Sequence, residues 1–343
     1  MPYYFNLPII TLLTNSQQIA LDETNAIALG GGPGTGKSVV CLWRHIRNYV
    51  TGTKRSLLLT YTKTLEHYLK HSASTQNADA STNINRTLWW TSHPNLHQQY
   101  DEIIIDEGQD VFIDRYEIIK NHSDSISYGA DEFQSLYLNK VQLTELFSWF
   151  RQNFDNEEYT LIKNFRNSRE ILEFTRSVFP NILIPQSAIN EATTTNLKPI
   201  VKLTGWDADK ELEVIMSIIN DFAGDTHNIG ILVPSQKQVN SFFERIREKL
   251  ENGIECTKFQ GEMEQFEGLS GVHITTYKSS KGTEFDTVIM PNFDSFDFMI
   301  KDPKIPVEEN DYYVAFTRTK TNLFLICKNN PNKGNTNTFD IEI

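Results

Sequence analysis

A short glycine-rich segment, GGPGTGKS at residues 31–38, carries the clearest chemical signal in the sequence. It matches the pattern GxxxxGK[ST], and it lies between an apolar strand-like segment and a helix-like segment, as that pattern requires. Glycines let backbone N–H groups curl around phosphate oxygens, and the N-terminus of the following helix adds positive charge. Lys37 is expected to reach the β- and γ-phosphates of a nucleotide, and the Ser38 hydroxyl is expected to hold Mg²⁺. The residues expected around the phosphates are Gly34, Thr35, Gly36, Lys37 and Ser38.

A pair of acidic residues follows a second apolar run. Residues 103–105 are all isoleucine and lead directly into DEGQD, residues 106–110. Asp106 is expected to bind Mg²⁺ through water, and Glu107 to orient or deprotonate the attacking water. Alone, such a pair is most often a solvated turn. After a phosphate-binding loop it indicates an enzyme that hydrolyses a nucleoside triphosphate.

The composition is that of a folded protein large enough for two domains. The chain has 343 residues, of which 39% are hydrophobic and 22% are charged. Its 32 basic and 44 acidic residues give a formal net charge of −12. This balance argues against a protein that coats nucleic acid without sequence preference, because the affinity of such a protein depends on many phosphate contacts. It leaves room for a narrow basic groove on an acidic body.

Signals of membrane or secreted proteins are missing from the sequence. Its apolar runs are all much shorter than a membrane span, and the N-terminal segment has neither the basic start nor the cleavage site of a secretory signal. Cys41, Cys256 and Cys327 are scattered and odd in number, so they predict no disulfide framework. We therefore expect a cytoplasmic protein with no membrane partner.

Strand-like and helix-like segments alternate along the chain, which is typical of parallel sheets covered by helices. The expected strands are 26–29, 56–60, 102–105, 125–128, 160–162, 200–203, 229–233, 273–276, 287–290 and 323–327. The expected helices are 141–154, 168–178, 209–222 and 236–250. A polar segment after residue 154 places the domain boundary near Glu157. We thus expect an α/β fold with two domains, residues 1–157 and 158–343.

Three segments carry weaker structural signals. Residues 71–86 are rich in Ser, Thr, Asn and Ala and are expected to form a loop or a vestige of a larger segment. The polar tail 329–338 is expected to be loose. Trp89 and Trp90 are expected to lie in a strand, where alternation buries one ring and exposes the other. Core packing is favoured for this pair, with nucleic-acid contact as the alternative.

Several motifs, taken in order, resemble those of the UvrD/Rep-like superfamily 1 DNA helicases. The resemblance extends from Leu13 to about Leu325 and rests on the whole set, because each motif alone is variable. In the first half the motifs are LTNSQ (13–17), LTYTK (59–63), DEGQD (106–110) and GADEFQSLY (129–137). In the second half they are LIKNFRNS (161–168), TTYKSSKGTEF (275–285) and YVAFTR (313–318).

The resemblance implies two tandem RecA-like P-loop domains with parallel sheets flanked by helices, and an ATP site in the cleft between the domains. It assigns Gln17 to recognition of the adenine edge and Gln134 to sensing of the γ-phosphate. Phe165 would stack on adenine, and Arg166 and Arg318 would reach the γ-phosphate. The residues that it implies for the nucleotide in the second domain are Phe165, Arg166, Gly282, Glu284 and Arg318.

The physical logic of phosphoryl transfer agrees with this assignment, because catalysis depends on positioning and on positive charge at the γ-phosphate oxygens. Lys37, Asp106 and Glu107 would lie on one domain, and Arg166 and Arg318 on the other. ATP binding would then close the cleft, and hydrolysis would release it. The implied cofactors are ATP and Mg²⁺.

The resemblance also predicts contacts with a nucleic-acid strand, and the sequence departs from the family at three positions. The implied contact residues are Tyr61, Thr62, Lys63, Thr276 and Lys278. Asn139 replaces a tryptophan that serves as a base-stacking platform, which forfeits about 1–3 kcal/mol per base. Val39 replaces an arginine over the adenine, and Lys278 replaces a histidine. Trp89, Trp90 or Tyr61 could take over the stacking role.

Large members of this family carry an insertion in each domain. Here roughly 30 residues separate Tyr61 from Thr91, and about a dozen separate Gln260 from Val272. Neither interval can hold a domain of ordinary size. The sequence therefore predicts a compact form without the insertion domains.

Two functions remain open on the sequence alone. The first is an ATP-dependent translocase or helicase that moves on single-stranded nucleic acid, with DNA favoured over RNA. The second is a regulatory ATPase switch that controls a protein partner, such as a nuclease in a multi-component system, without unwinding. The acidic balance, the lost tryptophan and the missing insertions favour the switch, whereas the complete motif set favours the translocase. Stimulation of turnover by nucleic acid would discriminate between them.

Overall fold

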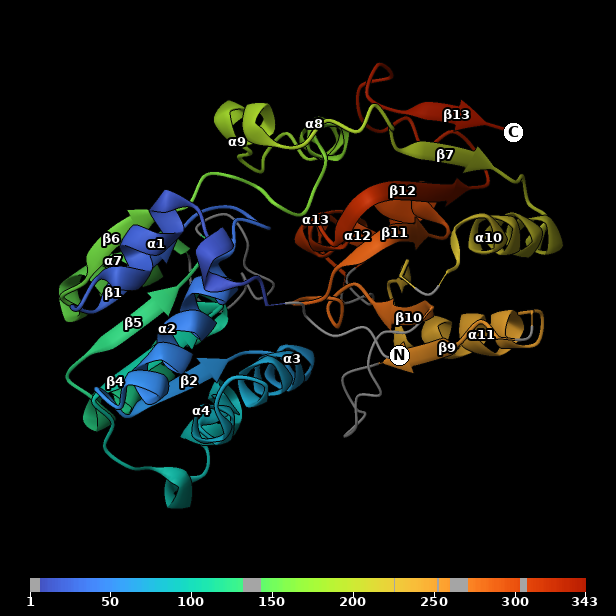
Figure 1. The fold of residues 1–343 in the computed structure, drawn as a ribbon. Helices are drawn as coiled ribbons and strands as arrows, with labels where there is room; N and C mark the ends of the chain where they lie inside the picture. The colour runs from blue at the N-terminus through green and yellow to red at the C-terminus, as the bar shows by residue number, and fades with distance from the viewer. Residues whose placement is uncertain (1–6, 132–142, 225, 252, 260–270, 303–306) are drawn as a thin grey trace. The chain divides into compact units, whose positions relative to one another are not determined.

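The computed structural model describes residues 7–131, 143–224, 226–251, 253–259, 271–302 and 307–343. The described chain forms two compact units, one of residues 7–164 and one of residues 165–343 (Figure 1). The first unit ends at Asn164, beyond the boundary expected near Glu157, because the strand that begins at Glu157 pairs with the first sheet.

The first unit is built on a sheet of six parallel strands in the order β3-β2-β4-β5-β1-β6. The strands are β1 (Ile27–Gly30), β2 (Ser56–Thr60), β3 (Ile84–Arg86), β4 (Glu102–Asp106), β5 (Ile126–Gly129) and β6 (Glu157–Thr160). Strands β2, β4 and β5 are buried along their whole length, which explains their nearly continuous apolar sequences. Because β5 lies between β1 and β4, the segments that follow these strands meet at the carboxyl edge of the sheet.

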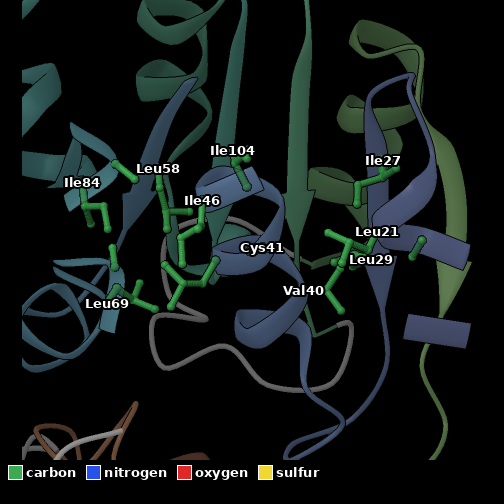
Figure 2. Packing of buried hydrophobic residues seen from close by; sticks show 14 of the residues in the cluster. Leu21, Ile27, Leu29, Val40, Cys41, Ile46, Leu58, Leu69, Ile84 and Ile104 are labelled. Atoms are coloured by element: carbon green, nitrogen blue, oxygen red, sulfur yellow. The ribbon is translucent and has the colours of Figure 1, made fainter. Parts of the chain in front are cut away.

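Helices and short 3-10 turns connect these strands. They are η1 (Ile10–Leu12), α1 (Asn15–Asp22), α2 (Lys37–Thr51), α3 (Lys63–Ser74), α4 (Ala78–Thr82), α5 (Thr87–Thr91), η2 (Pro94–Leu96), η3 (Gly108–Asp110), α6 (Ile113–Ile119), η4 (Lys120–His122) and α7 (Leu143–Asn153). In Figure 2, Val40, Cys41 and Ile46 of α2 face the strand residues Leu29 and Leu58. This packing fixes the helix that begins with the glycine-rich loop against the sheet.

A buried ion pair ties α2 to the strand that leads to Asp106. Arg44 Nε lies 2.6 Å from Glu102 Oε1, and both side chains are almost completely buried. Asn48 Nδ2 and Ser127 Oγ also donate to the Glu102 carboxylate, at 3.0 and 2.6 Å. Removing one partner of such a pair typically costs about 3–5 kcal/mol, because the other charge stays buried. The network therefore holds α2, β4 and β5 in a fixed relation.

The second unit is built on seven parallel strands in the order β13-β7-β12-β11-β8-β10-β9. The strands are β7 (Ile200–Leu203), β8 (Ile229–Val233), β9 (Cys256–Phe259), β10 (Val272–Thr276), β11 (Phe285–Met290), β12 (Thr319–Cys327) and β13 (Asp340–Glu342). The connecting elements are α8 (Arg169–Val178), α9 (Gln186–Glu191), α10 (Ala208–Phe222), α11 (Gln236–Arg247), η5 (Phe293–Ser295), α12 (Phe296–Lys301) and α13 (Glu309–Phe316).

Helices α10 and α11 cover this sheet with apolar residues at helical spacing. Leu212, Ile215 and Ile219 of α10 form one buried cluster with Val239 and Phe242 of α11 and with the apolar residues of β8 and β10. Their N-termini carry the expected capping residues, since the side chains of Asp207 and Ser235 accept backbone hydrogen bonds from the first turns. Within the part of the chain that the structure describes, every helix is too short or too polar to span a bilayer.

Four local expectations were wrong. Residues 71–86 are not a loop: they complete α3 and form α4 and β3, because Ala73, Ala80 and Ile84 are buried in the core. The strand expected at 160–162 is β6, which begins earlier and pairs with β1. The tail 329–338 is held on α8, where Ser177 Oγ accepts from Asn335 N at 3.0 Å, and it leads into β13. The two tryptophans lie in a helix, not in a strand.

The prediction that one of these tryptophans is buried and the other exposed is confirmed, although its stated cause was wrong. Trp90 is completely buried, whereas Trp89 exposes 47% of its surface. Both belong to α5, so helical geometry and not strand alternation separates them.

Candidate functional site

The glycine-rich loop joins β1 to α2, and its lysine points back onto the loop. Lys37 Nζ donates to the carbonyl oxygens of Gly31 and Gly32, at 2.6 and 2.9 Å, and lies 3.9 Å from Asp131 Oδ2. Asp131 follows β5, so the ammonium lies at the carboxyl edge where β1 and β5 end. The site thus has a cation at the centre of the loop.

Gln17 supports the loop from α1. Its side chain completes a capping box with Thr14, and its Nε2 donates to the carbonyl oxygen of Thr35 at 3.0 Å. Gly36 has a φ of 88°, and a Cβ there would lie 2.4 Å from Gln17 Nε2. A larger residue at position 36 would therefore displace Gln17. Gly34 also has a positive φ in this loop.

Ser38 and Asp106 lie together at this edge of the sheet. Ser38 Oγ lies 3.1 Å from Asp106 Oδ1, and Asp106 is 1% exposed. Among the described residues, Asp106 Oδ2 is buried without a hydrogen-bond partner. A Cβ on Gly129 would lie 3.1 Å from Cys41 Sγ and 3.6 Å from Asp106 Oδ1, so this glycine lets β5 pass close to α2 beside the carboxylate. A buried carboxylate oxygen and a hydroxyl are oxygen ligands of the kind that Mg²⁺ prefers, so the residues present fit this ion.

The ionised form of Asp106 is destabilised by its surroundings. Burial raises the pKa of Asp106 from its ordinary value of 3.8 to about 7, and the negative charge of Glu107 adds to this shift. The hydrogen bond from Ser38 opposes it. Below about pH 7 the folded protein therefore favours the protonated form of Asp106. Its stability is expected to fall as the pH rises from about 4 through about 7, because the carboxylate must then ionise in a buried place.

Asp106→Asn is accordingly expected to raise the melting temperature above neutral pH while it removes the response to Mg²⁺-ATP. The amide carries no charge, so the cost of burying the carboxylate disappears, although the ligand for the ion is lost. Thermal unfolding across this pH range, with and without Mg²⁺-ATP, checks both effects. Asp114→Asn is the matched control, because its side chain is 73% exposed. A variant that melts below the wild type at alkaline pH would contradict this account.

Glu107 has a strained backbone and a fixed side chain. Its φ of 58° lies in the left-handed region, which few non-glycine residues other than Asn and Asp occupy. Gln109 Nε2 donates to Glu107 Oε2 at 2.6 Å, and Gln109 Oε1 accepts from the backbone N of Asp131 at 3.1 Å. Gln109 therefore orients the acid from the end of β5. The sequence motif DEGQD contains this glutamine, but sequence reasoning assigned it no role.

Not every predicted residue of the first unit can be placed. Gln134 and Asn139 lie outside the described residues, as does Gln260. Tyr61, Thr62 and Lys63 follow β2 at the same carboxyl edge as the glycine-rich loop. Thr62 is the N-cap of α3, and its hydroxyl accepts from Leu65 N at 3.1 Å.

In the second unit the structure brings Arg166 and Glu284 together. Arg166 Nε lies 3.2 Å from Glu284 Oε2, and its Nη1 donates to Thr317 O at 3.5 Å. Lys320 Nζ lies 3.1 Å from the other oxygen of the same carboxylate. Burial would raise the pKa of Glu284, but the two cations outweigh it and lower the pKa. Sequence reasoning missed Lys320, although it follows Arg318 by two positions.

Arg318 is enclosed by its own unit. Its Nε donates to Val314 O at 3.0 Å, its Nη1 to Thr283 O at 3.4 Å and its Nη2 to Thr317 Oγ1 at 3.3 Å. Arg318 is only 3% exposed, so these bonds hold its guanidinium inside the unit. Phe165 by contrast exposes 52% of its surface at the start of this unit.

The remaining predicted residues lie in the segment after β10. The Thr276 hydroxyl accepts from Ser279 N at 3.1 Å, which fixes the turn that follows the strand. Lys278 Nζ lies 3.6 Å from Asp311 Oδ2. Gly282 has a positive φ and precedes Glu284 in the same turn. One short segment therefore carries residues predicted for the nucleotide and residues predicted for nucleic acid.

Comparisons with known proteins connect the sequence to helicases. Residues 240–330 match the UvrD-like helicase C-terminal domain. A predicted ATP-dependent DNA helicase of Acanthamoeba polyphaga mimivirus is 24% identical over 243 residues, which is 65% of this chain and 34% of that protein. An ATP-dependent helicase/nuclease subunit of Natranaerobius thermophilus is 34% identical over 99 residues, which is 26% of this chain and 8% of that protein. The chain thus spans about a third, or less, of these relatives.

The fold is that of tandem RecA-like domains. The structure of S. cerevisiae Dbp5 bound to RNA and ADP BeF3 covers 92% of this chain with a TM-score of 0.57 and 12% identity, and 84% of Dbp5 is matched. The two parallel sheets flanked by helices, which the sequence predicted, are confirmed. The chain carries a UvrD-like helicase C-terminal domain and is a distant homologue of the superfamily 1 DNA helicases.

Proposed function

We propose that this chain is an ATP-dependent motor that moves on single-stranded nucleic acid, with DNA favoured over RNA. One observation carries the ATPase part of the proposal. Lys37, Ser38, Asp106 and Glu107 meet at the carboxyl edge of one parallel sheet, with a buried carboxylate oxygen that has no hydrogen-bond partner in the described chain. The nucleic-acid part is supported by the names of the relatives, which include a DNA helicase.

Each group in the first unit has a proposed role. Lys37 moves from its loop carbonyls to the β- and γ-phosphates. Ser38 and Asp106 would hold Mg²⁺, which would neutralise charge on these phosphates. Glu107, oriented by Gln109, accepts the proton of the attacking water. Gln17 recognises the adenine edge and holds Thr35, so base recognition and the shape of the phosphate loop depend on one side chain.

The second unit supplies positive charge in this proposal. Arg166 and Arg318 stabilise the charge that develops on the γ-phosphate, Phe165 stacks on adenine, and Glu284 lies near the ribose beside Gly282. Tyr61, Thr62 and Lys63 of the first unit, and Thr276 and Lys278 of the second, contact the strand. The exposed Trp89 ring, which stacks on His93 at 3.8 Å, is a candidate replacement for the missing base platform.

A second function, an ATPase switch that controls a protein partner, is favoured by one specific observation. The Natranaerobius relative is named as part of a helicase/nuclease, and it is more identical over its short match than the mimivirus relative. A component of such an assembly could use the same ATP groups to control a nuclease.

ATP hydrolysis measured with and without nucleic acid separates these functions. We expect single-stranded DNA to stimulate turnover several-fold, single-stranded RNA to do so less, and duplex least, with Lys37→Ala as the blank. Turnover that ignores every polymer would overturn the motor and favour the switch. A chain that shows no turnover and binds no ATP would overturn both.

A further inference from the structure

Helix α13 is attached at both ends to the segment that follows β10. Near the start of the helix, Lys278 Nζ lies 3.6 Å from Asp311 Oδ2. Just beyond its end, Arg318 Nη1 donates to Thr283 O at 3.4 Å, and Phe285 N donates to Arg318 O at 2.9 Å. The proposed strand contact and the proposed catalytic arginine are therefore connected through one helix of the second unit.

Asp311 is a buried carboxylate whose charge depends on Lys278. The residue is 1% exposed, and its Oδ2 accepts from Glu308 N at 2.9 Å to cap the helix. Its Oδ1 has no hydrogen-bond partner within the described ranges. Burial raises the pKa of Asp311 to about 6, the cap bond and the charge of Lys278 oppose this, and the charge of Glu308 adds to it.

Lys278 can be withdrawn from this pair from the solvent side. Its side chain is 35% exposed, whereas that of Asp311 is 2% exposed. The residues beside this pair, Tyr277 and Tyr312, are packed together, with ring centroids 4.8 Å apart. A phosphate that attracts the ammonium would leave a buried carboxylate without its cation, which is unfavourable unless the carboxylate takes a proton or moves.

We propose that Asp311 is a positioning residue that couples the nucleic-acid strand to Arg318 through α13. The inference rests on the proposed function, because it needs Lys278 to contact a strand phosphate. When no nucleic acid is bound, the Lys278–Asp311 pair holds the first turn of α13 in place. When a phosphate takes Lys278, Asp311 accepts a proton from solvent, the first turn is released, and the short helix transmits this change to Arg318 after its last turn.

The test compares ATP turnover with and without oligo(dT) in variants of the full chain. Asp311→Asn keeps an acceptor for Glu308 N but loses the charge. Its turnover without nucleic acid is expected to rise about fivefold, and its stimulation by oligo(dT) to fall by a similar factor. Lys278→Arg keeps a cation beside Asp311, so its stimulation should fall less than that of Asp311→Asn. A purely structural role for Asp311 would lower turnover and would not raise it.

Strand affinity gives a second measurement. Because loss of Lys278 raises the pKa of Asp311 above about 6, strand binding takes up a proton, and affinity should increase as the pH falls from slightly alkaline toward about 6. Fluorescence anisotropy of labelled oligo(dT) should show this dependence in the wild type and lose it in Asp311→Asn. The charged and titratable groups around this carboxylate are Lys278, Glu308, Tyr277 and Tyr312, and the variant changes none of them.

Lys278→Met breaks the same pair from its exposed end, so the test survives if the asparagine variant fails to fold. Its turnover without nucleic acid should also rise, while its strand affinity falls. If both variants keep wild-type turnover and wild-type stimulation, the coupling is refuted and the motor function stands. If no strand stimulates the wild type, the motor function itself fails, and this inference fails with it.

Discussion

Glu107→Gln is expected to reduce ATP turnover by about 10²–10⁴-fold while ATP still binds. The amide keeps the size and the hydrogen-bonding shape of the side chain but cannot accept the proton of the attacking water. Gln109, which donates to Glu107 Oε2 at 2.6 Å, can still donate to the amide oxygen, so the local geometry should survive. Steady-state turnover together with binding of a fluorescent ATP analogue measures the two effects separately.

Two comparisons make this expectation specific. Glu117→Gln, an exposed acid on α6, should turn over ATP like the wild type. Lys37→Ala should lose turnover as well, but through weaker binding, because it removes the cation at the centre of the loop. Wild-type turnover in Glu107→Gln would exclude this carboxylate as the base.

Arg318→Ala is expected to reduce turnover at saturating ATP by about 10³–10⁵-fold, the range found for arginines that stabilise phosphoryl transfer. The structure adds a complication, because this guanidinium also donates to Val314 O, Thr283 O and Thr317 Oγ1. The alanine variant should therefore melt at a lower temperature too, since buried acceptors lose their donor at about 1–3 kcal/mol each.

Arg318→Lys separates the catalytic loss from the structural one. Lysine keeps the positive charge but cannot reproduce the fork of the guanidinium. We expect it to recover most of the thermal stability and little of the turnover. Arg247→Ala, an exposed arginine on α11, controls for loss of charge elsewhere in the same unit. If Arg318→Ala turns over ATP at the wild-type rate, this arginine has no role in the reaction.

The local sequence pattern was sufficient to predict most strands of both sheets. The expected strands 56–60, 200–203 and 229–233 have the observed bounds, because each is a short apolar run between polar connections. The missed strands β3, β9 and β13 are short and polar, and each is an edge strand of its sheet. Their side chains carry little apolar periodicity, so only pairing with a neighbouring strand identifies them.

The sequence by itself determined which chemistry is available to this protein. The GGPGTGKS loop and the acid pair of DEGQD are local motifs whose residue types suit phosphate and Mg²⁺, so the sequence was enough to predict a nucleotide site. The order of the later motifs was likewise sufficient for the family resemblance.

Only the tertiary structure decided how these groups are held. Arg166 and Glu284 are 118 residues apart in sequence, and no local pattern predicts that Arg166 and Lys320 both pair with the Glu284 carboxylate. The same is true of Lys278 and Asp311, whose pairing depends on how α13 packs beside the segment after β10. Residue type and spacing fix the functional groups, whereas long-range packing fixes burial and partners, and these set the charge and the position of each group.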